Sequence, residues 1–545
     1  MHYGKEIYST INNSFGKDPL REVLPYHTQN RMEDIARYHH AILESEKGDC
    51  ISYVDESTWN DLEMDQIFSR INHTHSAIGE QMLYHQLHRL QISKKDETST
   101  IAFEDRLSTY KNNPDLRTET EAVLHRIGKS REDCFLFEFL SETSAWKLGN
   151  PIVYHLLQIL LIGFGMLSIL TGAYWAMGAF ITVALVNLAV YVCTKQRYEV
   201  YLQGMMDFLR IYSGAEKMKK HFEKESLQVG EDVTDALRQL MKLSGLLGRL
   251  AGQKRSYVAG DLVGIINEYI FGVTLIDLTI FCYLKRILNE KREAVYEILN
   301  FIGTTDAEIA VASFRESLPY WCEPEFAEDG IEIRQIIHPL LENAIANDWA
   351  PGRCAIITGS NASGKSTFMK SLAINCILAQ TIHTCTAKYM RIRPYQVRTC
   401  MALRDDIRTG ESYYYREAKC LESMISCSDD ANMLLVIDEM LKGTNSRERI
   451  AASKAIIEYL ESQNAQVVVA THDLELTNAN GYDNYHFSSE IKNDNIVFDY
   501  KIHEGINAKS NAIALLDLLG YPETIIRRAK EYADANQRDC GTNRA

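Results

Sequence analysis

The stretch GSNASGKST, from Gly359 to Thr367, directly follows the apolar run CAII, from Cys354 to Ile357. It fits the pattern G-x-x-x-x-G-K-[ST], which predicts a buried strand, a glycine-rich loop and a helix that starts inside the loop. Backbone N–H groups of such a loop surround the β- and γ-phosphates of a nucleotide, aided by the helix N-terminus. Lys365 is expected to neutralise phosphate oxygens, and the Ser366 hydroxyl to bind Mg²⁺. The predicted nucleotide-binding residues of this loop are Gly359, Ser360, Asn361, Ala362, Ser363, Gly364, Lys365, Ser366 and Thr367.

Two later runs, MLLVIDE and QVVVATHD, are apolar, rich in β-branched residues and bounded by polar ones. This composition predicts buried parallel strands, whose carboxyl ends meet at one edge of a sheet. Asp438 and Glu439 end the first run, and His472 lies at the end of the second. We expect Asp438 to hold Mg²⁺ through water, Glu439 to orient or deprotonate the attacking water, and His472 to sense the γ-phosphate. The sequence therefore predicts an α/β P-loop domain that uses ATP and Mg²⁺, and the alternative is a P-loop fold without catalysis.

Length and charge limit what the rest of the chain can be. At 545 residues the chain is too long for a single core, which predicts several domains. A net charge of −15 does not attract nucleic acid to the protein as a whole, so any polyanion would need a local basic patch. Basic clusters occur at 217–220 and 254–255, although such a cluster on a helix is usually a solvated face. The 12 cysteines form no C-x-x-C pair and indicate reduced thiols in an intracellular protein.

One segment, residues 148–194, contains no Asp, Glu, Lys or Arg. A helix that spans a bilayer needs about 20 apolar residues, so the segment can hold two spans, at 152–171 and 176–194. Lys147 precedes the segment and Lys195 follows it. This predicts a transmembrane hairpin in the cell membrane, with both large domains on the cytoplasmic side. The alternative is a buried helical hairpin in a large soluble core.

The order of the nucleotide-site motifs narrows the class of ATPase. A glutamate directly after the aspartate, with a later strand that ends in histidine, is typical of ABC-type domains, which sandwich ATP between two subunits. Only 65 residues separate Thr367 from Met433, which leaves no room for the helical subdomain and the LSGGQ segment of a transporter. We therefore expect a homodimer in which a different signature segment of one subunit completes the site of the other.

At these residues the sequence resembles the MutS family of DNA mismatch repair ATPases. TGSNASGKST is similar to the family's TGPNxxGKST, IDEMLKGTN to its DExGxGT, and THDLELT to its THxxELT. The segment DIRTGES, from Asp406 to Ser412, resembles the family's signature segment, with Ser412 in the place of the serine that reaches across the dimer. Upstream, IIHPLLENAIANDW is similar to the start of the family's ATPase domain. The resemblance implies that Lys365, Glu439 and His472 act within one subunit, and that Ser412 contacts the nucleotide of the partner.

The resemblance continues outside the nucleotide site. LEMDQIFSRINHTHSAIGEQMLYHQLH and FEDRLSTYKNNPDLRTETEAVLHRIG are similar to the start of the family's helical core domain. GYPETIIRRAKEYAD is similar to its C-terminal closing helix. The similar regions cover residues 58–130 and 331–535.

The chain also departs from the family pattern. Only 57 residues precede the helical match, so we expect neither the mismatch-reading domain nor the connector domain. The apolar hairpin interrupts the core domain ahead of the place where DNA-clamp helices are expected. Ala344 stands where the family has an aromatic residue that stacks on adenine.

The predicted fold class is an α/β P-loop ATPase domain of the ABC/MutS type, C-terminal to an all-α core domain with an inserted apolar, transmembrane helical hairpin. The predicted function is a MutS-like ATPase in which ATP closes a homodimer and moves the helical core, with mismatched or branched DNA as a partner at the membrane. The alternative is a membrane-anchored ABC-type ATPase that acts on a protein partner and has no role in DNA repair. The expected domains are a polar helical segment (1–57), the first part of the core (58–147), the hairpin (148–194), the second part of the core (195–325), the ATPase domain (326–535) and a polar tail (536–545).

Overall fold

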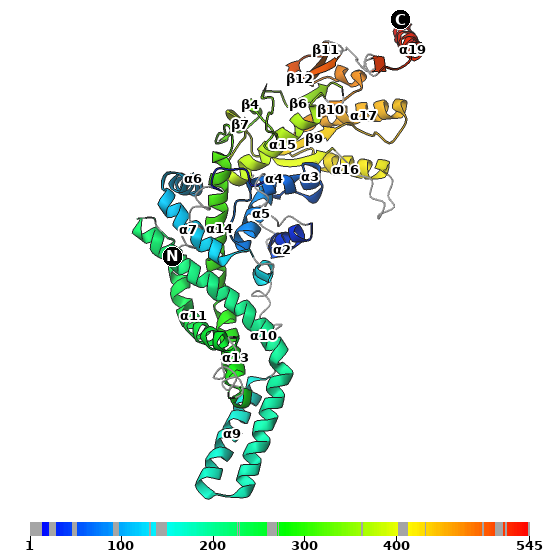
Figure 1. The fold of residues 1–545 in the computed structure, drawn as a ribbon. Coiled ribbons are helices and arrows are strands. Elements are labelled where there is room, and N and C mark those ends of the chain that lie inside the picture. The colour runs from blue at the N-terminus through cyan, green and yellow to red at the C-terminus, as the bar shows by residue number, and fades with distance from the viewer. Residues whose placement is uncertain are drawn as a thin grey trace. The chain divides into compact units, whose positions relative to one another are not determined.

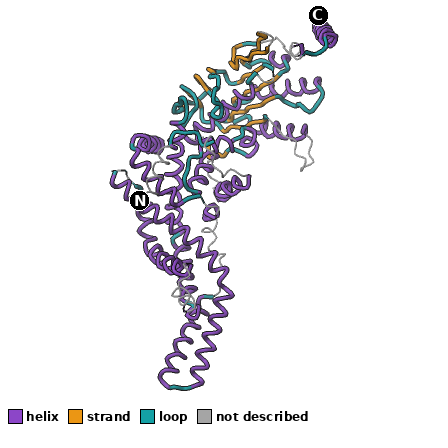
Figure 2. The backbone as a smooth tube through the Cα atoms, viewed as in Figure 1, coloured by secondary structure: helices purple, strands orange, loops and turns teal. Residues whose placement is uncertain are grey.

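The computed structural model describes most of the chain and divides it into two compact units. The helical unit comprises Met1–Lys47, Ile71–His85 and Ile101–Phe314, and the sheet unit comprises Gly48–Arg70, Gln86–Thr100 and Arg315–Ala545. Helices make up the first unit, and the strands belong to the second (Figure 2). The described residues are 14–20, 29–45, 52–90, 97–129, 132–137, 150–225, 227, 229–258, 270, 272–360, 363–401, 413–430, 432–492, 495–506, 516–517 and 520–542.

The helical unit has a core of fully buried apolar side chains such as Leu124, Phe208 and Phe281. Helix boundaries follow from local capping: Asn113 accepts a hydrogen bond from the Leu116 N–H at the start of one helix, directly before a proline. The helices, in whole or for most of their length, are α2 (Gln29–Ser45), α5 (Ala77–His88), α6 (Glu97–Asn112), α7 (Pro114–Ile127), η1 (Glu132–Phe135), α9 (Pro151–Thr171), α10 (Tyr174–Lys224), α11 (Glu231–Val258), α13 (Ile276–Glu290) and α14 (Arg292–Glu316) (Figure 1).

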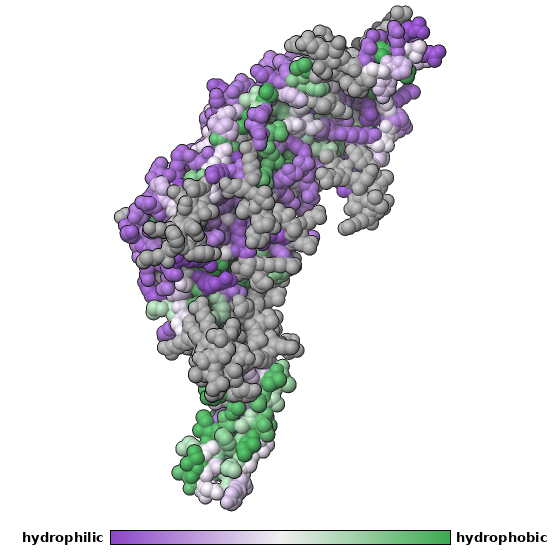
Figure 3. All heavy atoms as spheres, viewed as in Figure 1, coloured by the Kyte–Doolittle hydropathy of each residue, from purple (hydrophilic) through white to green (hydrophobic). Residues whose placement is uncertain are grey.

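The apolar segment forms two helices that pack against each other, α9 and the first part of α10 (Figure 1). Asn150 caps α9, and Gly172 ends it in the left-handed conformation that glycine adopts at low cost. Pro151–Thr171 and Tyr174–Thr194 are both long and apolar enough to cross a membrane, judged by length and composition. Only 11% and 17% of their most apolar windows are buried, and apolar residues make up much of the face of this hairpin seen in Figure 3. The predicted helical hairpin is present, and its surface is not that of a buried core.

Polar side chains of the hairpin contact the chain just before and within α13. Gln158 donates hydrogen bonds to the carbonyl of Thr274 (2.9 Å) and to the hydroxyl of Thr279 (3.0 Å). Asn187, which is fully buried, donates to the carbonyl of Val273 (2.7 Å). The stretch 272–279 therefore packs against both helices of the hairpin.

The sheet unit contains a six-stranded sheet that carries the predicted nucleotide motifs. Neighbouring strands are parallel, except that β11 and β12, at one edge of the sheet, are antiparallel. The three strands that the sequence predicts are buried along nearly their whole length, as their apolar, β-branched composition requires. The strand order is β12 (Asn495–Glu504), β11 (Asp483–Lys492), β6 (Cys354–Thr358), β10 (Gln466–Thr471), β9 (Met433–Asp438) and β8 (Gln396–Cys400).

Smaller elements complete the sheet unit. Helix α3 (Glu56–Asp61) packs on the edge strand β8, where Asp61 accepts hydrogen bonds from the Thr399 hydroxyl (3.0 Å) and the Met401 N–H (2.9 Å). A second sheet has the strand order β3 (Glu325–Phe326), β7 (Tyr389–Ile392), β4 (Ile331–Ile336) and β5 (Asn347–Trp349). The remaining elements are β1 (Ser52–Tyr53), β2 (Arg89–Leu90), α3 (Glu56–Asp61), α4 (Met64–Ile71), α15 (Lys365–Ile382), α16 (Tyr413–Cys427), α17 (Ser446–Glu461), η3 (Leu474–Asn478) and α19 (Glu523–Thr542).

Candidate functional site

The glycine-rich loop connects β6 to α15, the strand-to-helix position that its motif predicts. Gly359 has a φ of 145° and Gly364 a φ of 107°, values that residues with a side chain rarely adopt. The Lys365 ammonium donates hydrogen bonds to the carbonyl oxygens of Gly359 (2.6 Å) and Ser360 (3.1 Å). The lysine therefore lies against the first two residues of the loop. Two predicted loop residues, Asn361 and Ala362, lie outside the described residues.

Short-range hydrogen bonds hold the loop, and the Lys365 side chain in it is buried. Ser363 donates through its hydroxyl to the carbonyl of Ser360 (2.7 Å), and Phe368 donates through its N–H to the carbonyl of Gly364 (2.9 Å). Burial lowers the pKa of Lys365, while Asp438 and Glu439 act in the opposite direction. A buried lysine in a glycine-rich loop at the start of a helix is suited to binding a polyphosphate.

Ser366 and Asp438 meet although Ser366 lies after β6 and Asp438 ends β9. Their strands β6 and β9 both pair with β10, which lies between them. The Ser366 hydroxyl donates to Asp438 Oδ2 at 2.5 Å. A hydroxyl and a carboxylate are oxygen ligands of the type that Mg²⁺ takes. The residues present therefore fit the Mg²⁺ site that the motifs predict.

Glu439 follows β9 directly and contacts two basic side chains. His472, which follows β10, donates from Nε2 to Glu439 Oε1 at 2.6 Å, and Lys442 Nζ lies 3.3 Å from Oε2. The hydrogen bond from His472 lowers the pKa of Glu439 to about 2, and Lys442 adds to this effect. Glu439 is therefore ionised at neutral pH, as a residue that orients or deprotonates water must be.

The loop after β9 has an unusual backbone. Glu439 has a φ of 59° and Leu441 a φ of 58°, in the left-handed region. Leu441 occupies the place of the first glycine in the pattern DExGxGT, and each such conformation costs on the order of 1–3 kcal/mol. A hydrogen bond from the Glu439 N–H to the carbonyl of Ala470 (3.0 Å) holds the loop against β10. This strained loop carries the predicted catalytic carboxylate.

The same loop contacts the start of α16, the helix that follows the predicted signature segment. A Cβ on Gly443 would lie only 2.9 Å from Tyr414 Cβ, so glycine allows this close approach. The Lys442 N–H lies 3.3 Å from Glu417 Oε1, to which it donates a hydrogen bond. Ser412, the predicted residue that reaches a partner subunit, lies outside the described residues.

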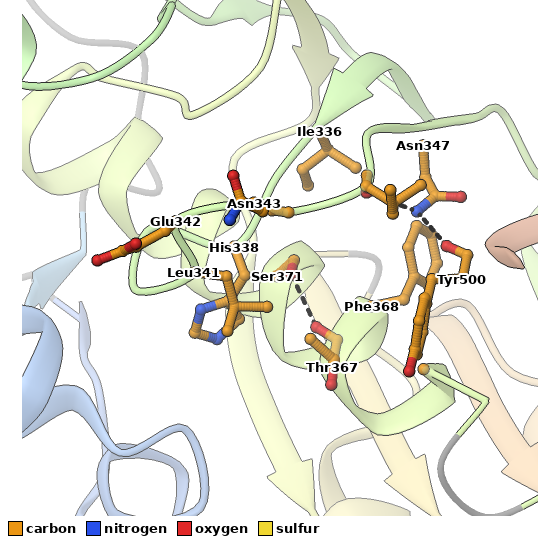
Figure 4. A pocket seen from close by; sticks show the side chains of 13 residues that line it. Ile336, His338, Leu341, Glu342, Asn343, Asn347, Thr367, Phe368, Ser371 and Tyr500 are labelled. Carbon is orange, nitrogen blue, oxygen red and sulfur yellow. Dashed lines mark hydrogen bonds between the residues drawn. The ribbon is translucent and has the colours of Figure 1, made fainter. Parts of the chain in front are cut away.

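A cavity of about 340 Å³ adjoins the glycine-rich loop. Figure 4 shows Tyr500 and Leu341 on opposite sides of it, with Thr367 at the start of α15 between them. Tyr500 lies beside the loop, because a Cβ on Gly364 would be 3.3 Å from Tyr500 Cδ1. The lining residues are Ile336, His338, Leu341, Glu342, Asn343, Ala344, Ile345, Asn347, Gly364, Thr367, Phe368, Ser371 and Tyr500.

Two residues of this site have no signal in the sequence motifs. Tyr500 comes from β12, which is placed beside the loop by the pairing of β11 with β6 and by hydrogen bonds to Asn347 of β5. Lys442 belongs to the motif IDEMLKGTN but has no assigned role in it. The alternation of apolar residues in the run NIVFDYKIHE predicts a strand, but it does not predict which cavity the strand borders.

Comparison with known proteins gives a family match within the sheet unit and several similar relatives. Residues 355–536 match the family model MutS domain V. The chain is 32% identical over 274 residues to the DNA mismatch repair protein MutS of Caldanaerobacter subterraneus subsp. tengcongensis, covering 46% of this chain and 31% of that protein. It is 30% identical over 299 residues to MutS protein homolog 4 of Homo sapiens, covering 51% of this chain and 32% of that protein.

A third relative gives the same picture. The chain is 26% identical over 299 residues to DNA mismatch repair protein MutS 2 of Haloarcula marismortui, covering 49% of this chain and 31% of that protein. The matched part of the chain thus spans about a third of the length of the curated relatives that it matches.

Proposed function

We propose that the chain is a MutS-type ATPase that binds ATP and Mg²⁺ at the carboxyl ends of β6, β9 and β10. Its match to MutS domain V over residues 355–536 and its similarity to MutS proteins support this. The observation that carries the proposal is the meeting of three groups at this one edge. They are Lys365 in the glycine-rich loop, the Ser366–Asp438 pair, and the Glu439–His472 pair. A cation, a metal-binding pair and an ionised carboxylate are the parts that phosphoryl transfer to water requires.

Each residue has a defined task in this proposal. Lys365 and the backbone N–H groups of the loop bind the β- and γ-phosphates, and Ser366 and Asp438 hold Mg²⁺. Bound Mg²⁺ neutralises charge on the phosphate oxygens. Glu439 orients the attacking water and accepts its proton, and His472 holds the Glu439 carboxylate in place through the 2.6 Å hydrogen bond.

The cavity beside the loop is the proposed site of the adenine ring. Ala344 lines it and offers no ring for stacking. Tyr500 supplies an aromatic face from a different strand, and its backbone is fixed because its carbonyl accepts a hydrogen bond from Asn347 (3.1 Å). We therefore assign to Tyr500 the stacking role that position 344 lacks.

ATP binding is proposed to close a head-to-tail homodimer and hydrolysis to reopen it, with movement of the helical unit as the output. The contact of α16 with the loop after Glu439 supports this, because it links the helix behind Ser412 to the catalytic carboxylate. Since relatives of this chain are named DNA mismatch repair proteins, mismatched or branched DNA is the proposed binding partner. A membrane protein partner is the second candidate, favoured by the apolar hairpin.

One binding experiment tests the proposed nucleotide site independently of which partner the protein binds. ATP affinity is measured by calorimetry for the purified full chain and for Lys365→Ala. Loss of a charge-assisted contact should weaken binding about 10- to 100-fold. Equal affinity for both proteins would reject the proposed site.

The proposed partner is tested by measuring the affinity of ATP-bound Glu439→Gln for homoduplex, mismatched and branched DNA at two salt concentrations. Contacts to phosphates make affinity fall steeply with salt. A salt-sensitive preference for mismatched or branched DNA supports the DNA proposal. A protein that still dimerises with ATP but binds no DNA supports the protein partner.

The hairpin is proposed to anchor the chain in the cell membrane, with both units on the cytoplasmic side. Ile162 and Leu185, each the twelfth residue of its span, are 62% exposed. Arginine at both positions should release the chain from the membrane fraction, because a central charge costs about 2.5–3.5 kcal/mol on insertion scales. Met241→Arg, at a site on α11 that is 59% exposed, is the control that should stay bound. Membrane attachment unaffected by the two arginines would rule out spanning.

A further inference from the structure

Three side chains of the helical unit, His73, His75 and Glu121, come together between the α4–α5 loop and α7. One nitrogen or oxygen atom of each lies within 4.8 Å of the corresponding atoms of the other two. We infer that these residues form a binding site for a divalent transition-metal ion of the Zn²⁺ type. Their nitrogen and oxygen atoms, burial and hydrogen bonding carry this inference, which does not depend on the proposed nucleotide chemistry.

His73 has its tautomer fixed by a neighbour. Its Nε2 lies 2.8 Å from the carbonyl oxygen of Ser14. A carbonyl only accepts hydrogen bonds, so Nε2 carries the proton and Nδ1 carries the free electron pair. Nδ1 is buried and has no hydrogen-bond partner among the described residues. A backbone carbonyl behind one imidazole nitrogen is the usual way in which a metal-binding histidine is oriented.

Glu121 is the second unusual group. Its side chain is 0% exposed, and neither carboxylate oxygen accepts a hydrogen bond from a described residue. Oε1 lies 3.5 Å from His75 Nε2, and Oε2 lies 3.7 Å from Arg117 Nε. Buried carboxylates without hydrogen bonds are rare and call for an explanation such as an ion. Arg117 compensates one oxygen only in part and leaves Oε1 directed at the histidines.

The ligands are held in place before any ion binds. Asp306 on α14 accepts hydrogen bonds from the N–H groups of His75 (2.9 Å) and Ser76 (2.7 Å) and from the Ser76 hydroxyl (2.5 Å). Glu121 lies within α7, a regular helix. A site supported by a helix and by hydrogen bonds behind its ligands is preorganised.

The ligand set selects the class of ion. Two imidazole nitrogens and one carboxylate oxygen suit Zn²⁺ and related transition metals, whereas Mg²⁺ and Ca²⁺ prefer oxygen alone. The 3.5 Å between His75 Nε2 and Glu121 Oε1 matches two ligands about 2.1 Å from a shared tetrahedral ion. Three protein ligands leave a fourth position for water or another ligand.

The test measures Zn²⁺ bound to the full chain purified in detergent and stripped with a chelator. Zn²⁺ is titrated against a chromophoric chelator into wild type, Glu121→Gln and Glu119→Gln. Glu119 is the matched control, because it lies on the same helix and is 43% exposed. Wild type and Glu119→Gln should bind one Zn²⁺ more per chain than Glu121→Gln, or bind it at least about tenfold more tightly. Co²⁺ in the site should show the visible absorption of a nitrogen–oxygen site without a thiolate charge-transfer band.

A second variant keeps the test valid if Glu121→Gln fails to fold. His73→Asn keeps a donor for the Ser14 carbonyl and removes the metal-binding nitrogen, and it should lose the same Zn²⁺. Thermal unfolding with and without Zn²⁺ completes the test: Zn²⁺ should raise the Tm of wild type and of Glu119→Gln, but not of the two site variants. Equal Zn²⁺ binding and equal Tm shifts in all four proteins would overturn the inference.

Discussion

Removing the Tyr500 ring tests the proposed adenine site. Tyr500 is 46% exposed, so truncation to alanine takes little from the core. Its backbone should stay in place, because Asn347 donates to the Tyr500 carbonyl (3.1 Å) and accepts from the Ile502 N–H (2.8 Å). Stacking of a base on an aromatic side chain contributes about 1–3 kcal/mol by alanine substitution. For a ring exposed on one side we expect the middle of this range, which weakens ATP binding about 10- to 30-fold.

The assay is isothermal calorimetry with two ligands, ATP and inorganic triphosphate. Triphosphate contacts the loop but has no base, so its affinity for Tyr500→Ala should stay within about twofold of wild type. Tyr500→Phe keeps the ring and should bind both ligands within about twofold of wild type. If Tyr500→Ala binds ATP as tightly as wild type, or loses both ligands equally, the adenine does not lie against this ring.

Two further predictions concern stability. A Cβ on Gly79 would lie 2.2 Å from Asp306 Oδ2, so Gly79→Ala should lower the free energy of unfolding by about 1–3 kcal/mol. A Cβ on Gly245 would have no atom within 4 Å, so Gly245→Ala in a helix should raise that free energy by about 0.5–1 kcal/mol. Equal changes in Tm for the two variants would contradict this prediction. Burial lowers the pKa of His338 from 6.5 to about 4. Between pH 6.5 and 4, His338 is therefore protonated in the unfolded chain but stays neutral in the folded chain. Wild type should therefore lose stability on acidification faster than His338→Gln, by up to about 1.4 kcal/mol per pH unit, with no difference in slope above pH 7; parallel denaturation curves would contradict it.

The parts of the fold that depend on local pattern could be predicted from the sequence. Three buried strands followed from apolar, β-branched runs, and the pairing of Ser366 with Asp438 followed from the rule that parallel strands end at one edge. The apolar hairpin followed from the absence of charge over two helix lengths. The resemblance to the MutS family is confirmed by the family model over residues 355–536.

The parts that depend on tertiary packing could not be predicted. Tyr500 borders the cavity because β11 pairs with both β6 and β12, and because Asn347 holds β12 through hydrogen bonds. The sequence around Glu121 does not distinguish it from Glu119. In the structure Glu121 is buried beside His75 of the α4–α5 loop, whereas Glu119 is exposed. Leu441 reads as an ordinary apolar residue, although its backbone adopts a conformation that favours glycine. For Tyr500 and Glu121 the deciding contacts join residues that are far apart in the sequence and that no helix or strand period relates.

Steady-state ATP hydrolysis by the purified full chain tests the central claim most directly. Wild type is compared with Glu439→Gln and with Glu458→Gln, a control on α17 whose side chain is 60% exposed. The account predicts Mg²⁺-dependent turnover that Glu439→Gln lowers about 10²- to 10⁴-fold, with ATP binding retained and with Glu458→Gln unchanged. Turnover by Glu439→Gln at the wild-type rate, or no turnover by wild type, would contradict it.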